Sequence, residues 1–381
     1  MQDEFDNEKT TEADQENNQP DTVMMTEEER IMAEQAARIK KEENGKKLRF
    51  AANRIGWATV VLVVVWMGIL LGFTALINLT YSKELALFYQ KYYVIINEAS
   101  IALAMVVAYF VLRAVPKADV QPENFSAGRF FKLIFMCFGA GYIGNQIGTV
   151  LLSFWNSTTH NSVGGELTEL LADTNPLFVF ISVGILAPII EELFFRKLLT
   201  DRLQALGGEK TAIIIPAFLF ALFHQSASQL VYAFFVGIFI GYFYCRTGKY
   251  WLAVIIHAVF NIVSGVIPVL YLPKVARFLD ESQKIISADT NIDSSALAEQ
   301  LTPLVEQYGL AVCLFLLHSV IVFVINILGI IFIVKNFKKY KEREIEHALS
   351  FGESFNIIFR TPGIFVCTML LSILTIISLF A

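Results

Sequence analysis

Long apolar stretches alternate with short polar connections along most of the chain. A helix needs about 20 mostly apolar residues to cross the hydrocarbon core of a bilayer, which is roughly 30 Å thick. Stretches of this kind lie at 56–79, 93–115, 131–155, 177–195, 211–225, 229–245, 250–271, 309–334 and 363–380. Because helices satisfy their own backbone hydrogen bonds in lipid, the pattern predicts an all-α polytopic membrane protein, a bundle of about eight or nine transmembrane helices.

The composition supports a membrane protein. Of the 381 residues, 55% are hydrophobic and only 17% are charged, whereas soluble domains carry roughly 25% charged residues. The net charge of −5 comes from residues 1–50, whose 14 acidic and 8 basic side chains give −6 and leave +1 for the remainder. The cysteines, Cys137, Cys245, Cys313 and Cys367, lie in apolar stretches without paired spacing. A nucleic-acid-binding protein, a disulfide scaffold and a single soluble domain are therefore poor interpretations.

Basic residues orient the spans, because connections rich in Lys and Arg stay in the cytoplasm. Seven of them form a group close before the first span: Arg38, Lys40, Lys41, Lys46, Lys47, Arg49 and Arg54. Further groups follow at every second connection: Arg113 to Lys132, Arg196 to Lys210, Arg246 with Lys249, and Lys335 to Arg343. We expect a multi-pass protein with a cytoplasmic amino terminus, no cleaved signal peptide, and a place in the plasma membrane of a bacterium.

The chain divides by composition into five segments. Residues 1–50 are expected to form a polar cytoplasmic tail, disordered to residue 25 and then helical, since Thr26 and Glu29 have the spacing of a capping box. The other segments are N-terminal transmembrane helices (51–175), a catalytic core with the motifs described below (176–271), an extracytoplasmic loop with short helices (272–307) and C-terminal transmembrane helices (308–381).

Few ionisable side chains lie inside the predicted spans, and each is a candidate functional group because a charge in lipid is expensive. They are Glu98, Glu191, Glu192, His224, His257 and His318. Glu192 and Arg196 are four residues apart, so they can form a structural ion pair on one helix face. Glu191 is rotated by about 100° from Glu192 and has no partner on its own helix, so it would hold a proton, a water or a metal ion. Pro188 should loosen the helix just before it.

Two further segments supply imidazole and amide groups. His224 ends the run Phe220-Ala-Leu-Phe-His, and His257 and Asn261 lie four residues apart on one helix face. With an unpaired glutamate, these are the groups that hydrolysis of a peptide bond requires: a base, an imidazole that orients water, and donors for the oxyanion. Glu98, beside Asn97, is expected to line a cavity or to pair between helices, and His318 to pack between helices.

The motifs Glu191-Glu192-x-x-x-Arg196, Phe220-x-x-x-His224 and His257-x-x-x-Asn261 follow in this order. They resemble the three motifs of the CAAX prenyl protease and bacteriocin-processing (CPBP, or Abi) family of intramembrane proteases, and the sequences that connect them are similar as well. The resemblance covers roughly residues 180–265. It implies a membrane endopeptidase in which Glu191 activates water with His224, while His257 and Asn261 bind the developing oxyanion and Glu192 with Arg196 is structural.

The resemblance leaves two mechanisms open. In one, Glu191 and His224 activate water directly. In the other, Glu191, His224 and His257 bind a Zn²⁺ whose water is the nucleophile, although the His-Glu-x-x-His spacing of soluble zinc proteases is absent. No organic cofactor is expected. The implied partners are the lipid bilayer and a membrane-anchored or amphipathic peptide, such as a prenylated (CAAX-like) carboxyl-terminal motif or a bacteriocin precursor, and no nucleic acid.

A non-proteolytic transporter or membrane scaffold is the alternative, with Glu191, His224 and His257 binding protons or ions. The predicted topology sets a condition for either function, because it puts Glu191 and His257 near the cytoplasmic half and His224 near the outer end of a short span. These residues can meet only if the helix that begins near Thr211 starts below the membrane surface, tilts strongly, or does not fully cross.

Overall fold

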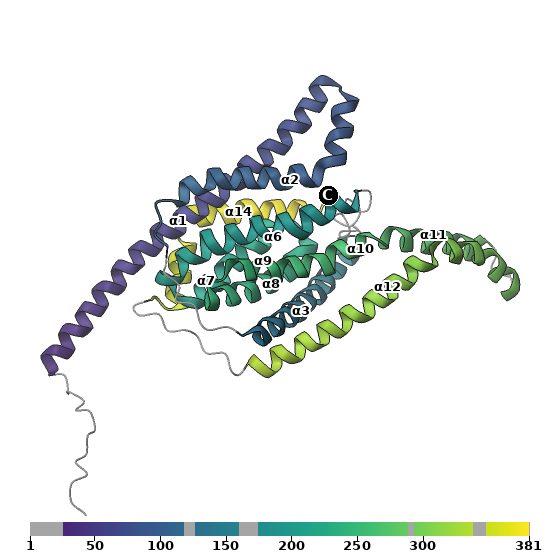
Figure 1. The fold of residues 1–381 in the computed structure, drawn as a ribbon. Coiled ribbons are helices and arrows are strands. Elements are labelled where there is room, and N and C mark those ends of the chain that lie inside the picture. Colours follow the sequence, from purple (N-terminus) through teal and green to yellow (C-terminus); the bar gives the residue numbers. More distant parts are fainter. Residues whose placement is uncertain (1–25, 118–125, 160–173, 289–292, 338–347, 381) are drawn as a thin grey trace, which may run out of the picture. The chain divides into compact units, whose positions relative to one another are not determined.

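Nearly all of the described chain is helical (Figure 1). The computed structural model describes residues 26–117, 126–159, 174–288, 293–337 and 348–380, and no β-strand occurs among them. The chain separates into two compact units, Met1–Lys40 and Lys41–Ala381, and the second unit contains the helices that form the candidate site. The disorder expected for residues 1–25 lies outside the described residues.

The elements are α-helices with three π-helical segments, denoted η. In chain order they are α1 (Glu27–Thr80), α2 (Lys83–Leu112), α3 (Ala127–Thr159), α5 (Pro176–Val179), η1 (Phe180–Leu186), α6 (Ala187–Glu192), η2 (Leu193–Thr200), α7 (Asp201–Phe223), α8 (Ala227–Thr247), α9 (Tyr250–Asn261), η3 (Ile262–Val266), α10 (Ile267–Val269), α11 (Leu272–Ala288), α12 (Ser294–Phe337), α13 (Phe351–Phe359) and α14 (Pro362–Ile377).

Within the described ranges, seven helical segments are long and apolar enough to cross a membrane, or eight if the pair α13 and α14, bent by 78°, forms one span. This confirms the predicted all-α polytopic bundle. The count falls below nine because Pro176–Phe223 counts as one segment, although it contains two of the expected spans, 177–195 and 211–225. That segment is broken at Gly208, whose φ of 75° and ψ of 176° are not helical and are readily adopted by a residue without a Cβ atom.

The two halves of Pro176–Phe223 pack against each other as an antiparallel hairpin. The Thr200 hydroxyl donates to the carbonyl of Ala212 at 3.2 Å, and the rings of Phe195 and Phe220 have centroids 5.1 Å apart. Residue 200 of the first half thus lies beside residue 212 of the second, and residue 195 lies beside residue 220, so the two halves run in opposite directions. The same register places the end of α7 beside α6, the helix that carries Glu191 and Glu192.

π-Helical segments flank the motif-bearing helices. The segments η1 and η2 lie on either side of α6, and η3 follows α9 directly. Pro188 has no N–H and cannot bond to the carbonyl of Gly184, and η1 ends two residues before this proline. The loosened helix predicted at Pro188 is therefore confirmed. Such widened turns are rare and frequently occur at functional sites.

The helices α3 and α8 pack in close contact. A Cβ atom on Gly144 would lie 2.7 Å from the Cα atom of Tyr232, a distance that Cβ atoms essentially never show to a non-bonded neighbour. Only glycine therefore allows this helix crossing, in agreement with the close packing that small residues permit between membrane helices. The crossing fixes the position of Tyr232 on α8.

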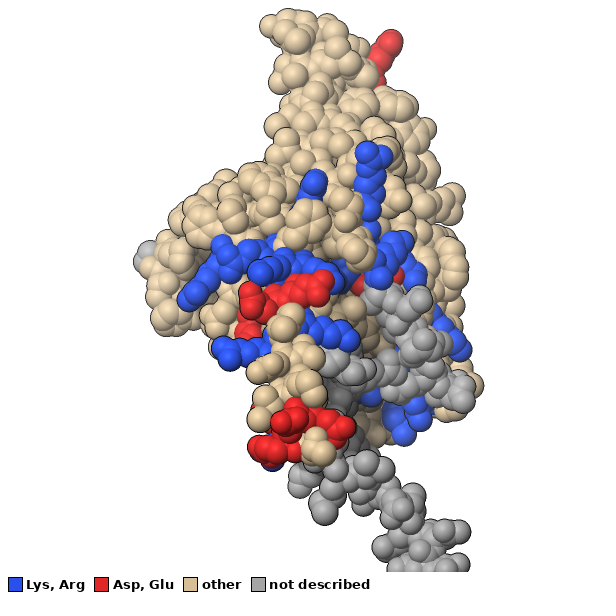
Figure 2. All heavy atoms as spheres, turned by 90° about the vertical axis from the view of Figure 1, so that its left-hand side faces the viewer, with Lys and Arg blue, Asp and Glu red and all other residues tan. Residues whose placement is uncertain are grey.

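Two local features of the flanking segments can be compared with the prediction. The N–H of Thr26 donates to Glu29 Oε2 at 2.8 Å and the N–H of Glu29 donates to Thr26 Oγ1 at 3.2 Å, which confirms the capping box. Within 272–307, Leu272–Ala288 forms the helix α11, but the residues from Ser294 onward are the start of the long α12 and not a separate short helix. Figure 2 shows Lys and Arg side chains gathered in a band across the face that lies on the left in Figure 1.

Candidate active site

Polar side chains from several helices line one cavity of about 960 Å³. Glu191 of α6, His224 at the end of α7, and His257 and Asn261 of α9 all belong to its lining, and Glu98 of α2 lies there as well. The antiparallel register of the hairpin brings His224 to the cavity that also contains Glu191. The structure therefore places all four predicted catalytic residues around one space.

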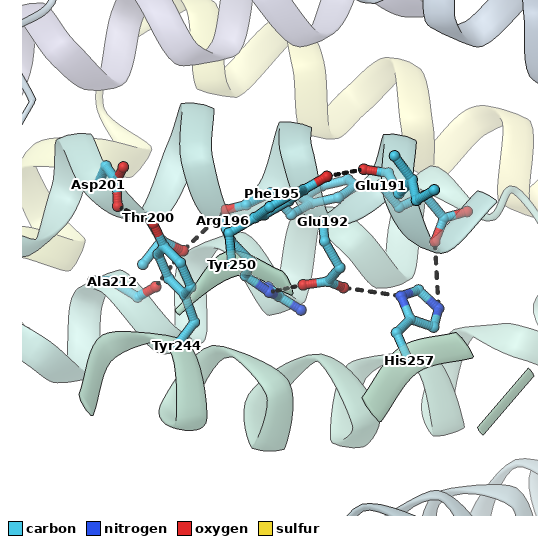
Figure 3. A network of polar contacts seen from close by, with 11 residues as sticks. Glu191, Glu192, Phe195, Arg196, Thr200, Asp201, Ala212, Tyr244, Tyr250 and His257 are labelled. Atoms are coloured by element: carbon cyan, nitrogen blue, oxygen red, sulfur yellow. Dashed lines mark hydrogen bonds and ion pairs between the residues drawn. The ribbon is translucent and has the colours of Figure 1, made fainter. Parts of the chain in front are cut away.

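Next to this cavity, the Glu192 carboxylate contacts both Arg196 and His257 (Figure 3). Arg196 Nε donates to Glu192 Oε2 at 2.7 Å, and both side chains are fully buried, which confirms the predicted ion pair. Glu192 Oε1 lies 2.9 Å from Nδ1 of His257, a contact between α6 and α9 that sequence spacing does not predict. A carboxylate paired with arginine only accepts hydrogen bonds, so the proton on this side of the His257 ring is on Nδ1 and the ring orientation is fixed.

Glu191 faces the other nitrogen of the same imidazole. Its Oε2 atom lies 3.6 Å from Nε2 of His257, beyond hydrogen-bond distance, and is buried without a hydrogen-bond partner among the described residues. Because Glu192 occupies Nδ1, a proton on Nε2 or on Glu191 is needed to keep two lone pairs from facing each other. Glu191 is therefore the carboxylate of this pair that can exchange a proton with water in the cavity.

His224 ends α7 and uses its ring to cap that helix. Its Nδ1 lies 2.8 Å from the carbonyl oxygen of Phe220, and since a carbonyl only accepts, Nδ1 carries the proton and Nε2 keeps its lone pair. The Phe220 ring contacts both histidines, with centroids 4.7 Å from His224 and 5.7 Å from His257. One phenyl ring thus supports both imidazoles, and each imidazole has Nδ1 engaged.

Asn261 connects α9 to the widened turns of η1. Its Nδ2 atom donates to the carbonyl of Val183 at 3.0 Å. An amide nitrogen carries two N–H groups, so the second remains available to a ligand in the cavity. The Tyr250 hydroxyl donates to the carbonyl of Ile189 at 2.7 Å, which attaches α9 to α6 at a second point. Together these bonds hold the two motif-bearing helices in register.

A zinc site built from Glu191, His224 and His257 requires three donor atoms about 2.0–2.2 Å from one point. Within the described part of the chain, no three His, Cys, Asp or Glu side chains lie close enough together to hold a metal ion. The three residues do not fit a metal site in this arrangement, and zinc binding stays a prediction.

Sequence reasoning missed part of the cavity wall. Trp66 of α1 donates through Nε1 to Asn97 Oδ1 at 3.0 Å, and Asn97 Nδ2 donates to Glu98 Oε1 at 3.2 Å. Tyr232 of α8 also lines the cavity. Tryptophan and tyrosine are common in membrane helices, so nothing in a single sequence distinguishes these two. The polar pair Asn97 and Glu98 inside an apolar span was the one available indication.

Comparison with models of known protein families gives a match. Residues 173–263 match the family model described as type II CAAX prenyl endopeptidase Rce1-like, and this supports membership of the CAAX protease family. The matched segment contains all four predicted catalytic residues. No curated protein and no solved structure matches the chain. The family is a protease family, which supports a hydrolase, and with the apolar helices it supports an integral membrane protein.

Proposed function

We infer from this membership of the CAAX protease family, and from the four motif side chains around one cavity, that the protein is an intramembrane endopeptidase. It hydrolyses a peptide bond in a membrane-anchored or amphipathic peptide, such as a prenylated carboxyl-terminal motif or a bacteriocin precursor. The nucleophile is a water molecule activated by Glu191 and His224.

The contrast between two neighbouring carboxylates carries this proposal. Glu192 is fully buried and accepts from both Arg196 and His257, so it remains ionised and holds its partners in place. Glu191 lines the cavity and has a buried oxygen that accepts no hydrogen bond from any described residue. Two carboxyl groups in such different surroundings are suited to different tasks, one structural and one acid–base.

The reaction begins with a water held between Glu191 and Nε2 of His224. The proton between Glu191 and His257 is on Nε2 of His257 at this stage, so Glu191 is ionised and acts as the base. Glu191 takes a proton from the water as the water oxygen attacks the scissile carbonyl carbon. Nε2–H of His257 and the free N–H of Asn261 donate to the oxyanion, a contribution of roughly 3 kcal/mol for each donor. Glu191 then returns the proton to the leaving amine as the carbon–nitrogen bond breaks.

The distribution of basic residues supports an orientation for this reaction. Lys and Arg gather in a band across one face (Figure 2), and basic residues concentrate on the cytoplasmic side of membrane proteins. We propose that this face and the amino terminus are cytoplasmic, in a bacterial plasma membrane. A peptide anchored in the same membrane as the protein could then reach the cavity by moving along the bilayer.

The test is cleavage of internally quenched peptides with a lipid anchor by the purified protein in lipid nanodiscs. Glu191→Gln keeps the shape of the side chain but removes the base, and should lower the rate by about 100-fold or more. Its melting temperature should stay near that of the unaltered protein, because Oε2 of Glu191 makes no hydrogen bond in the described structure. Glu84→Gln, in the exposed first turn of α2, is the matched control and should retain full activity.

Unchanged cleavage by both Glu191→Gln and His224→Gln would reject the protease. If those substitutions instead abolished a solute flux measured across proteoliposomes, the transporter alternative would take its place.

A further inference from the structure

Glu98 is a second carboxylate of the cavity, outside the three motifs. It lies near the middle of α2, and only 8% of its surface is exposed. Its Oε1 atom accepts from Asn97, whose own carbonyl accepts from Trp66 of α1. The Trp66 ring packs on Phe223, with centroids 5.4 Å apart, directly before His224. The carboxylate is therefore held by a chain of contacts that reaches the motif-bearing end of α7.

The second oxygen of Glu98 has no such support. Oε2 is buried and has no hydrogen-bond partner among the described residues, while the side chain belongs to the cavity lining. An unsatisfied buried carboxylate oxygen is costly, and natural proteins rarely retain one without a ligand or a functional reason. Because Asn97 donates to Oε1, Oε2 is the oxygen that can accept a hydrogen bond from a group that enters the cavity.

The charge of the lining identifies the kind of group. Its described residues include the carboxylates Glu98 and Glu191 but no Lys or Arg. An anionic group would meet two carboxylates and no permanent cation, whereas an ammonium or guanidinium group would form a charge-assisted hydrogen bond. Trp66, Tyr93 and Tyr142 also line the cavity, and aromatic rings accommodate the apolar stem of a lysine or arginine and its cationic head.

We infer that Glu98 forms a binding subsite for a basic side chain, lysine or arginine, located close to the scissile bond of the peptide substrate. This inference rests on the proposed endopeptidase function and gives it a substrate preference. Glu98 positions the peptide and takes no part in bond cleavage, because Glu191 and the two histidines already supply the acid–base groups.

A peptide series tests the subsite with the unaltered protein. Internally quenched, lipid-anchored peptides would differ only in carrying Lys, Gln or Glu at one position, and that position would be moved along the residues on both sides of the cleaved bond. At one position the Lys peptide should have a kcat/KM about tenfold to 100-fold above that of the Gln peptide, as a hydrogen bond between charged groups provides. The Glu peptide should be the slowest of the three.

Substitutions at Glu98 test whether this residue causes the preference for the Lys peptide. Glu98→Gln should bring the ratio of kcat/KM for the Lys and Gln peptides to about one, and Glu98→Lys should make the Glu peptide the best substrate. Glu84→Gln on the same helix should keep the original ratio. Equal rates for all three peptides at every position, or a lysine preference that survives Glu98→Gln, would overturn the subsite.

A binding measurement separates this inference from the proposed function. The same peptides, labelled with a fluorophore, would be titrated against Glu191→Gln and against the double variant Glu98→Gln/Glu191→Gln, neither of which needs to cleave them. Tighter binding of the Lys peptide to the single variant alone supports the subsite even if no peptide is hydrolysed. Equal binding of the three peptides to the single variant rejects the subsite even if the unaltered protein is a protease.

Discussion

Nδ1 of His257 and Oε1 of Glu192 lie 2.9 Å apart, although 65 residues separate them in the chain. The other oxygen of the same carboxylate accepts from Arg196. Glu192 therefore has a wider role than the helix-internal ion pair that its spacing predicts, since it also orients an imidazole of the cavity. In the motif Glu191-Glu192-x-x-x-Arg196, the Glu192 carboxylate faces Nδ1 of His257 and the Glu191 carboxylate faces Nε2.

Glu192→Gln should impair both stability and activity. The substitution leaves the fully buried Arg196 without a counter-charge, and breaking a buried pair in this way costs about 3–5 kcal/mol. It also replaces the acceptor of the His257 proton by an amide that can be turned either way. We expect a clearly lower melting temperature in detergent and a loss of peptide cleavage. Glu191→Gln on the same turn should lose activity but retain the melting temperature, and equal thermal destabilisation by the two variants would contradict this division of roles.

Phe220→Leu should reduce catalysis more than stability. A swap of one large apolar side chain for another usually costs less than about 1.5 kcal/mol, but it removes the ring that contacts both His224 and His257. Displacement of catalytic groups by about 1 Å can lower a rate by roughly 100-fold, so kcat should fall at least tenfold in the peptide assay. Phe218→Leu, whose ring packs on Phe359, is the matched control on the same helix and should keep its kcat. Similar rates for the two variants would show that Phe220 does not position the histidines.

Gly144→Ala should destabilise the protein through the crossing of α3 and α8. The added methyl group would lie 2.7 Å from the Cα atom of Tyr232, so the backbone of one helix has to move. Overpacking of this kind typically costs about 1–3 kcal/mol. Gly72→Ala in α1 has no atom within 4 Å of the added group and should be neutral or slightly stabilising, because alanine favours a helix by up to about 1 kcal/mol. Thermal unfolding of both variants in one detergent measures the difference, and a Gly144→Ala variant as stable as Gly72→Ala would contradict the close crossing.

Metal content and chelator sensitivity decide between the two mechanisms. Because no three suitable side chains converge in the described structure, we expect the purified, active protein to contain zinc well below one equivalent. Incubation with 1,10-phenanthroline, followed by its removal, should leave the cleavage rate unchanged. Stoichiometric zinc that disappears in the double variant His224→Gln/His257→Gln, together with loss of activity on chelation, would establish the metal mechanism instead.

Much of the fold could be predicted from the chain because its signals are local. Apolar stretches long enough to span lipid predicted the helical bundle, and the four-residue spacing of Glu192 and Arg196 predicted their ion pair. Pro188 marked the loosened turn before the site. Each of these depends on the geometry of one helix or on the missing atoms of one residue.

The chemistry of the candidate site was also readable as a set of residue types, since glutamate, histidine and asparagine are rare in apolar spans. Their arrangement was not. The condition on His224, that its helix must begin low, tilt or stop short, arose because the helix with Glu191 was expected to end at residue 195. The helical segment instead continues to the reversal at Gly208, and the pairing of Thr200 with Ala212 then places the end of α7 beside α6.

The sequence by itself determined which helices form and which polar groups they carry, because helix formation, ion pairing at four residues and backbone loosening act over a few residues. Only the tertiary structure decided that Glu192 holds His257, that Phe220 supports two histidines, and that Glu98 lies in the same cavity as Glu191. These contacts join residues on different helices, and their geometry depends on how far each helix is shifted and rotated against its neighbours, which packing over the whole bundle sets.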